Sequence, residues 1–188
     1  MKLPEVLRNI TGALEKAGIT YMLTGSFASA YHGSPRTTQD IDMVIEATAE
    51  QLLNFVNLLL QIDYYVELDA GIEALRRQSM FNVVDTSSGW KVDLIIRKSR
   101  NFSEEEFRRR KRVQFEGNPL FIASGEDVVI SKLEWAKQGE SKRQIEDAGG
   151  VLLHALARTG QKIFARMGGG LEPCGRMADC SQDSWASE

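Results

Sequence analysis

Hydrophobic positions in the first third of the chain switch between helical and strand spacing. Near the N-terminus, apolar residues recur every three or four positions, which predicts an amphipathic helix over residues 4–17. Short apolar runs at 19–24 and 41–46 predict buried strands, and small residues between them predict a helix over 25–31. Helical spacing returns with a strongly apolar face at 49–60. The alternation of helices with strands along the chain indicates a sheet covered by helices.

The middle of the chain is predicted to contain mostly strands, with helices after it. Residues 64–78 are predicted as a strand or loop followed by a short helix. Two hairpins are expected, with strands at residues 81–84 and 90–96, and at residues 113–115 and 120–122. Ser103 and Ser124 each precede an acidic residue by three positions, a capping pattern that predicts a helix start at both places. With a last helix at 141–157, the fold class is α/β or α+β with a mixed sheet and a helical end.

The composition is that of an ordinary soluble globular protein. Of 188 residues, 43% are hydrophobic and 26% are charged, which suits one domain with a small helical appendage. No apolar run is long enough for a membrane span, and no secretory signal is visible at the N-terminus. Two cysteines, Cys174 and Cys180, are too few for a disulfide framework, so a cytoplasmic protein is expected. The formal net charge of -3 argues against general nucleic-acid binding.

The composition changes late in the chain. Three consecutive glycines, both cysteines and a serine-rich end all follow residue 160. We therefore predict a core over residues 1–123 and a C-terminal helical segment over 124–160 that packs on it. Residues 161–188 are predicted to form a weakly structured tail without catalytic groups.

Two aspartates flank Ile41 in a predicted strand that is otherwise apolar. Alternate residues of a strand share a face, so Asp40 and Asp42 point the same way while Ile41 enters the core. Two neighbouring carboxylates repel each other unless a positive charge lies between them. A divalent cation fits, most naturally Mg²⁺, because it prefers oxygen ligands. The alternative is that both aspartates mark a solvated strand edge.

A second group of residues is suited to phosphate. Gly25 and Ser26 lie between a predicted strand and a predicted helix, where free backbone N–H groups can hold a phosphate. The fork-shaped guanidinium of Arg36 suits the same ligand. Each feature has a plainer explanation, which is a simple turn for the Gly-Ser pair and a surface loop for the arginine.

A third carboxylate, Asp93, lies inside the apolar run from Trp90 to Ile96. A lone buried acid is strongly destabilising unless it is paired or bound to metal. Asp93 therefore requires a partner, which is either a shared metal ion or a salt bridge to Lys91 or Arg97.

In this order, the segments G-S, R-T-T-x-D-I-D and V-D-L-I resemble the nucleotidyltransferase superfamily typified by DNA polymerase β. The resemblance implies a nucleotidyltransferase fold, which is a mixed β-sheet flanked by helices with a C-terminal helical segment. It implies that the catalytic, metal-binding acids are Asp40, Asp42 and Asp93. It also implies that the nucleotide-binding residues are Gly25, Ser26, Arg36 and Thr38.

The downstream segment from Ser124 to Asp147 resembles the abortive-infection, AbiEii-like nucleotidyltransferases, many of which are toxins of toxin–antitoxin pairs. In that group a helical lysine and a later acid belong to the active site, which implies catalytic roles for Lys132 and Asp147. The plainer explanations are a surface lysine and a pair between Asp147 and Arg143 one helical turn apart. The toxins commonly have Gly-Gly where this chain has Gly-Ser, so a toxin role and an antitoxin partner are weaker expectations than the fold.

The expected reaction is transfer of a nucleoside monophosphate from an NTP to an RNA 3′ end, a protein hydroxyl or a small molecule. The expected cofactor is Mg²⁺, with Mn²⁺ as its substitute. The main alternative is a non-catalytic module of the same fold that binds a nucleotide or a protein, and a metal-dependent phosphohydrolase ranks third. The basic run from Arg108 to Arg112 is interpreted as a solvated helix end, and Trp90 and Trp135 as core residues.

Overall fold

The computed structural model describes residues 2–139 and 141–167 of the chain. It divides the chain into two units, Met1–Leu156 and Ala157–Glu188, and the helix α7 (Lys142–Met167) crosses the division. No helix within the described residues is long and apolar enough to cross a membrane. All contacts discussed below belong to the larger unit.

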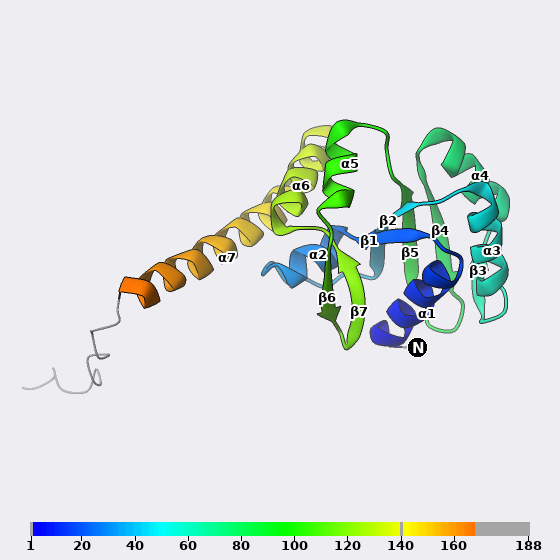
Figure 1. The fold of residues 1–188 in the computed structure, drawn as a ribbon, viewed down its shortest axis with the longest axis horizontal. Coiled ribbons are helices and arrows are strands. Elements are labelled where there is room, and N and C mark those ends of the chain that lie inside the picture. Colours follow the sequence, from blue (N-terminus) through cyan, green and yellow to red (C-terminus); the bar gives the residue numbers. More distant parts are fainter. Residues whose placement is uncertain (1, 140, 168–188) are drawn as a thin grey trace, which may run out of the picture. The chain divides into compact units, whose positions relative to one another are not determined.

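The larger unit alternates helices and strands along its first half and places strands before helices in its second half (Figure 1). The helices are α1 (Leu3–Lys16), α2 (Gly25–Tyr31), α3 (Ala49–Leu59), α4 (Leu68–Arg77), α5 (Asn101–Arg108), α6 (Gly125–Gly139) and the start of α7. The strands are β1 (Thr20–Leu23), β2 (Asp40–Glu46), β3 (Tyr64–Val66), β4 (Met80–Asp85), β5 (Lys91–Ile96), β6 (Lys111–Phe115) and β7 (Asn118–Ile122).

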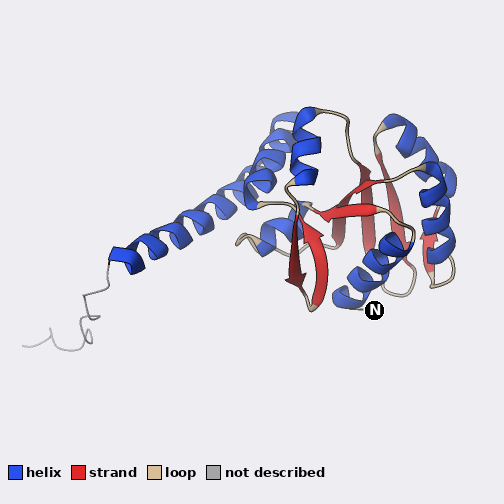
Figure 2. Ribbon diagram, viewed as in Figure 1, coloured by secondary structure: helices blue, strands red, loops and turns tan. Residues whose placement is uncertain are grey.

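All seven strands form one mixed sheet in the order β3-β4-β5-β2-β1-β7-β6. Figure 2 shows the strands in red with the helices, in blue, around them. The neighbours β2 and β5 run parallel, as do β1 and β7, and every other pairing is antiparallel. The prediction of a mixed sheet flanked by helices, with helices at the C-terminal side, is therefore confirmed.

The two faces of the central strands differ in chemistry. On β2, Ile41, Met43 and Ile45 are fully buried on one face, and the same face of β5 carries Val92 and Leu94. Helix α3 contacts both α1 and α4, and these three helices cover this face. The other face presents the intervening residues, because successive strand residues point to opposite sides.

That second face is arranged in three rows across β4, β5 and β2. The strand register places Val84 beside Lys91 and Asp40, then Asn82 beside Asp93 and Asp42, then Met80 beside Ile95 and Val44. A charged row, a carboxylate row and an apolar row therefore follow one another along the strands. The register alone brings two of the three predicted acids side by side.

Of the two helix starts predicted from capping patterns, one is confirmed and one is wrong. At α6, the Asp127 N–H donates to Ser124 Oγ at 3.2 Å and the Ser124 hydroxyl donates to Asp127 Oδ2 at 2.6 Å, as the capping pattern predicted. The matching prediction at Ser103 is wrong, because α5 begins at Asn101. Ser103 lies inside the first turn, and its hydroxyl oxygen accepts a hydrogen bond from Arg100 Nε at 3.0 Å.

The predicted last helix is present but longer than expected, since α7 runs to Met167. Its early part packs closely on the loop after α2, because Gly150 has no side chain there. A Cβ at Gly150 would lie 2.5 Å from Ser34 Oγ. The predicted boundary between helical segment and tail at residue 160 stays a prediction, because residues 168–188 lie outside the described residues.

Candidate active site

The carboxylates of β2 and β5 are positioned by the strand register. Asp42 and Asp93 are direct neighbours on parallel strands, and Asp40 lies beside Lys91 one row away. All three aspartates line one pocket of about 290 Å³. The fold thus brings together the three acids that the sequence placed on two separate segments, and their role as metal ligands stays a prediction.

The N-terminus of α2 lies directly against Asp42. Gly25 has a φ of +62°, and a Cβ at this position would lie 1.9 Å from Asp42 Oδ2. Any side chain at Gly25 would therefore be strained by the backbone conformation and would also collide with the carboxylate. The next backbone N–H, that of Ser26, donates a hydrogen bond to Asp42. Gly25 is thus explained by the close approach of an acid, a contact that the sequence did not reveal.

Asp42 is an acid whose environment opposes its charge. Burial raises the pKa of Asp42 above its ordinary value, and the neighbouring Asp93 and Asp40 raise it further. Lys132 and the Ser26 N–H act in the opposite direction without cancelling the effect. No salt bridge within the described part of the chain includes Asp42. A cation bound here would relieve this repulsion.

Asp93 and Asp40, in contrast, share a cation supplied by the protein. Lys91 Nζ lies 3.2 Å from Asp93 Oδ2 and 3.5 Å from Asp40 Oδ1. The other oxygen of Asp93 accepts a hydrogen bond from Asn82 on β4. The salt bridge to Lys91 that the sequence left open is therefore present, whereas Arg97 pairs with Glu46 at 2.6 Å instead.

Across the pocket, two basic side chains share one buried acid. Asp147 Oδ2 accepts hydrogen bonds from Lys132 Nζ at 2.8 Å and from Arg36 Nε at 3.1 Å. The Arg36 guanidinium also donates to the Ser26 hydroxyl at the start of α2. Lys132 is only 5% exposed, so it is not the surface lysine of the plainer explanation. Asp147 does not pair with Arg143, because its carboxylate faces Lys132 and Arg36.

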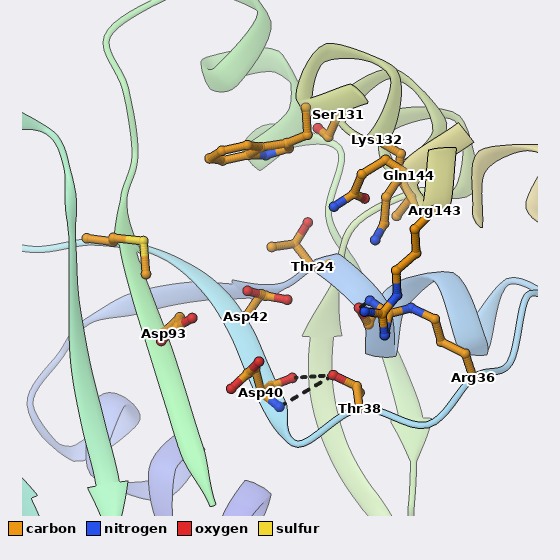
Figure 3. Close-up of a pocket in the computed structure, with 15 residues that line it drawn as sticks. Thr24, Arg36, Thr38, Asp40, Asp42, Asp93, Ser131, Lys132, Arg143 and Gln144 are labelled. Atoms are coloured by element: carbon orange, nitrogen blue, oxygen red, sulfur yellow. Dashed lines mark hydrogen bonds between the residues drawn. The ribbon is translucent and has the colours of Figure 1, made fainter. Parts of the chain in front are cut away.

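The pocket is lined by acids on one side and by donors on the other (Figure 3). Asp40, Asp42 and Asp93 lie across from Lys132, Arg143 and Gln144, which belong to α6 and α7. Thr38 lies at the edge beside Asp40, and its hydroxyl is 3.4 Å from the Asp40 backbone nitrogen. Of the predicted site residues, only Asp147 does not line the pocket itself, and it holds two residues that do.

Several residues that line the pocket are not predicted from the sequence, and the prediction that Trp135 is a core residue is wrong. It was expected in the core, yet it is 56% exposed and lines the pocket together with Met80 and Val128. Trp135 lies three positions after Lys132 on α6, the spacing that places two side chains on one helix face. That spacing was the available signal. Arg143 and Gln144 carried no comparable signal, because their position depends on how α7 packs.

The basic run beside the site is largely used for structure. Arg108 pairs with Glu105, Arg109 pairs with the buried Asp127, and the Arg110 guanidinium lies over the ring of Phe107 at 4.4 Å from its centroid. This agrees with the interpretation of the run as a helix end.

The donor set fits a hard divalent cation, although the ligands are not assembled around one position. Among residues 2–139 and 141–167, no three His, Cys, Asp or Glu side chains form a ready cage for an ion. The available donors are carboxylate oxygens, which Mg²⁺ prefers, and Asp42 lacks a cationic partner. Lys91 holds Asp40 and Asp93, so a metal would require these carboxylates to exchange partners.

Comparison with solved structures identifies the architecture. ANT(2")-Ia in complex with adenylyl-2"-tobramycin superposes with a TM-score of 0.54 at 15% identity, over 86% of this chain and 94% of that one. The lincosamide antibiotic adenylyltransferase LnuA, bound to lincomycin, gives a TM-score of 0.54 at 12% identity, over 80% of this chain and 96% of that one. The fold is that of the nucleotidyltransferases.

A candidate nucleotidyltransferase from Thermotoga maritima shares this nucleotidyltransferase fold, with a TM-score of 0.50 at 16% identity over 88% of this chain and 96% of that one. No protein-family model matches the sequence, and no curated protein matches it. The comparisons therefore support the polymerase β-like fold predicted from the sequence, and the narrower resemblance to AbiEii-like proteins stays a prediction.

Proposed function

We propose that this protein is a metal-dependent nucleotidyltransferase that transfers a nucleoside monophosphate from an NTP to an acceptor hydroxyl. The observation that carries the proposal is the position of Asp42. Its carboxylate lies against the start of α2, beside Asp93, without a salt bridge in the described part of the chain and with a pKa raised by burial and by two neighbouring acids. Repulsion among these carboxylates destabilises the folded protein. A divalent cation bound with a triphosphate would remove this repulsion, and its binding would be strengthened by the same amount.

The residues that would hold the metal are Asp40, Asp42 and Asp93. When bound there, Mg²⁺ would lower the pKa of the attacking hydroxyl and offset charge on the leaving pyrophosphate. The acceptor oxygen forms a bond to the α-phosphorus while the bond from that phosphorus to the pyrophosphate oxygen breaks. The proton of the acceptor passes to Asp93, the acid whose partners, Lys91 and Asn82, can both rearrange.

The triphosphate would bind between the start of α2 and the donors of α6 and α7. The start of α2 would offer the Gly25 N–H, because the Ser26 N–H already donates to Asp42. Arg36 donates to the Ser26 hydroxyl beside it. Lys132 and Arg143 add positive charge from the opposite wall. Asp147 fixes Lys132 and Arg36 in place, so we assign it a positioning role rather than contact with substrate.

The nucleobase would occupy the apolar end of the pocket. On the second face of the sheet, the apolar row across β2, β5 and β4 ends in Met80. Met80 lines the pocket, and Trp135 lines the same pocket from α6. Both side chains are unusually exposed for their type, at 44% and 56%. An exposed indole beside a phosphate-binding wall suits stacking of a base.

The acceptor is not determined by these residues. The two adenylyltransferases of similar fold have antibiotics in their complexes. The sequence leaves an RNA 3′ end, a protein hydroxyl and a small molecule open as acceptors, and its resemblance to toxins adds an antitoxin as a partner. The pocket of about 290 Å³ is at the lower limit of sizes that hold a small molecule. We therefore propose that it takes the NTP and that the acceptor binds at its open edge.

The direct test is incubation of the protein with each α-labelled NTP, Mg²⁺, and separate RNA and protein fractions from cells. The proposal expects label on one fraction with one NTP, and no label with Asp42→Asn. Tight, metal-dependent NTP binding without transfer to any acceptor would instead support the non-catalytic module. Neither binding nor transfer with any NTP would overturn both.

A further inference from the structure

Lys91 occupies an unusual position for a lysine beside a cation site. It lies two residues before Asp93 on the same face of β5, and its register partner on β2 is Asp40. Its Nζ is within 3.5 Å of one oxygen from each aspartate. The side chain is 40% exposed, so its four-carbon arm can leave the site without disturbing the core.

The three carboxylates near Lys91 differ in how far a neighbouring positive charge compensates them. Three carboxylates face the pocket, and the single positive charge of Lys91 is shared by two of them, Asp40 and Asp93. The lysine that lines the pocket, Lys132, is held by Asp147 at 2.8 Å and forms no salt bridge with the three acids. Asp42 forms no salt bridge within the described residues, so the three carboxylates together keep an excess of negative charge over Lys91.

We propose that Lys91 is an internal counter-ion that holds Asp40 and Asp93 in the metal-free protein, and that a divalent cation must displace its ammonium group to bind. This inference rests on the proposed metal-dependent function. Mg²⁺ coordinates oxygens at about 2.0–2.1 Å and tolerates little distortion. Asp93 Oδ1 is taken by Asn82 and Asp93 Oδ2 by Lys91, so an ion at Asp93 competes directly with the lysine.

The competition couples the metal to the nucleotide. An ion that arrives alone must break two ion pairs and leave the lysine without a partner. An ion that arrives with a triphosphate brings phosphate oxygens that can receive the displaced ammonium. The empty site is thereby kept folded despite its clustered acids, and loading with metal is favoured when the nucleotide is present.

The test is direct measurement of Mn²⁺ binding to the nucleotide-free protein by electron paramagnetic resonance, which needs no turnover. Lys91→Met should bind Mn²⁺ about tenfold more tightly than the natural protein, because a competing cation is gone. Lys91→Arg keeps the charge and should bind no more tightly than the natural protein. If circular dichroism shows that Lys91→Met does not fold, Lys91→Gln takes its place.

Two controls separate the possible outcomes. Lys137→Met removes one positive charge from an exposed position of α6 and should leave Mn²⁺ affinity unchanged. Asp42→Asn should lose the bound ion, which locates the ion at this pocket. Equal or weaker Mn²⁺ binding by Lys91→Met would show that the lysine orients the acids rather than competing, with the proposed function intact. No Mn²⁺ binding by any variant, with or without NTP, would overturn this inference and the proposed metal site together.

Discussion

Two aspartates, Asp127 and Asp42, each lie against the start of a helix, and their surroundings are opposite. Asp127 is 1% exposed and bonded by Arg109 through two nitrogens, at 2.5 Å and 3.1 Å, and by the Ser124 hydroxyl. Burial opposes its ionisation, yet Arg109 and Ser124 hold its pKa below the ordinary value. Asp42 has two acidic neighbours, no salt bridge and a raised pKa.

The contrast teaches how to separate a structural acid from a functional one. A structural acid is compensated by the protein itself, so it contributes to folding as it stands. A functional acid is left with unfavourable electrostatics that only a ligand relieves, and the rest of the fold must offset the cost. Substitutions at the two kinds of acid should therefore have opposite effects on stability and activity.

The largest effect is expected from Asp42→Asn. Loss of a metal-binding carboxylate should lower the rate of nucleotidyl transfer by about a thousandfold or more, equivalent to about 4 kcal/mol of transition-state stabilisation. Its free energy of unfolding should stay the same or rise, because a repelled charge is removed. Labelled-nucleotide transfer and urea denaturation measure the two quantities.

The matched variant is Asp127→Asn, which should lose stability and keep the transfer activity. Loss of a charged hydrogen-bond acceptor should cost about 2 kcal/mol of stability, while transfer by the folded fraction persists. The comparison fails if Asp42→Asn unfolds the protein, or if folded Asp127→Asn loses transfer.

A second large effect is expected at Lys132. Lys132→Met leaves the buried carboxylate of Asp147 with Arg36 alone, which should cost about 3 kcal/mol of stability and weaken NTP binding. Because both residues belong to one network, the double variant Lys132→Met with Asp147→Asn should be more stable than the sum of the single effects predicts. A double-mutant cycle by urea denaturation measures this coupling, and strict additivity would contradict the network.

The sequence was informative where chemistry depends on local spacing. Asp40 and Asp42 share a face because strand residues alternate, and Asp93 stood out because its strand is otherwise apolar. The strands and helices of the larger unit follow from the same periodicity. The family resemblance implied that Asp147 belongs to the active site, but its pairing with Arg36, 111 positions earlier, was not predicted, because no local pattern reports a contact at such a distance.

What could not be read from the sequence depends on packing between elements. Trp135 looks like a core residue by composition, and only the placement of α6 beside the sheet exposes it at the pocket. The close contact of Gly25 with Asp42 depends on how α2 leaves β1. Lys91 was left as one of two candidate partners of Asp93, because side-chain reach across strands is set by the register.

A smaller effect, with a defined pH dependence, is expected at Glu106. Burial raises the pKa of this carboxyl from 4.5 to about 7, although a hydrogen bond from Ser131, a pocket residue, acts to lower it. The folded state therefore binds a proton that the unfolded state has lost between pH 4.5 and about 7, so stability falls as pH rises through this window. Glu106→Gln should remove this fall, about 2 kcal/mol. Urea denaturation at pH 5 and pH 8 measures it, and an unchanged difference between the two pH values would contradict the assignment.

The smallest effect is expected at Trp135, and it tests whether the apolar end of the pocket takes the nucleobase. Trp135→Ala removes the stacking surface and should weaken NTP binding by about 1.5 kcal/mol, roughly tenfold in Kd, while Trp135→Phe keeps most of it. Stability should change little, because the side chain is more than half exposed. Isothermal titration with an NTP and with inorganic triphosphate separates the base from the phosphates, since only NTP binding should depend on Trp135. Equal loss of both ligands would place the indole at the phosphates, and no loss of either would remove Trp135 from the nucleotide site.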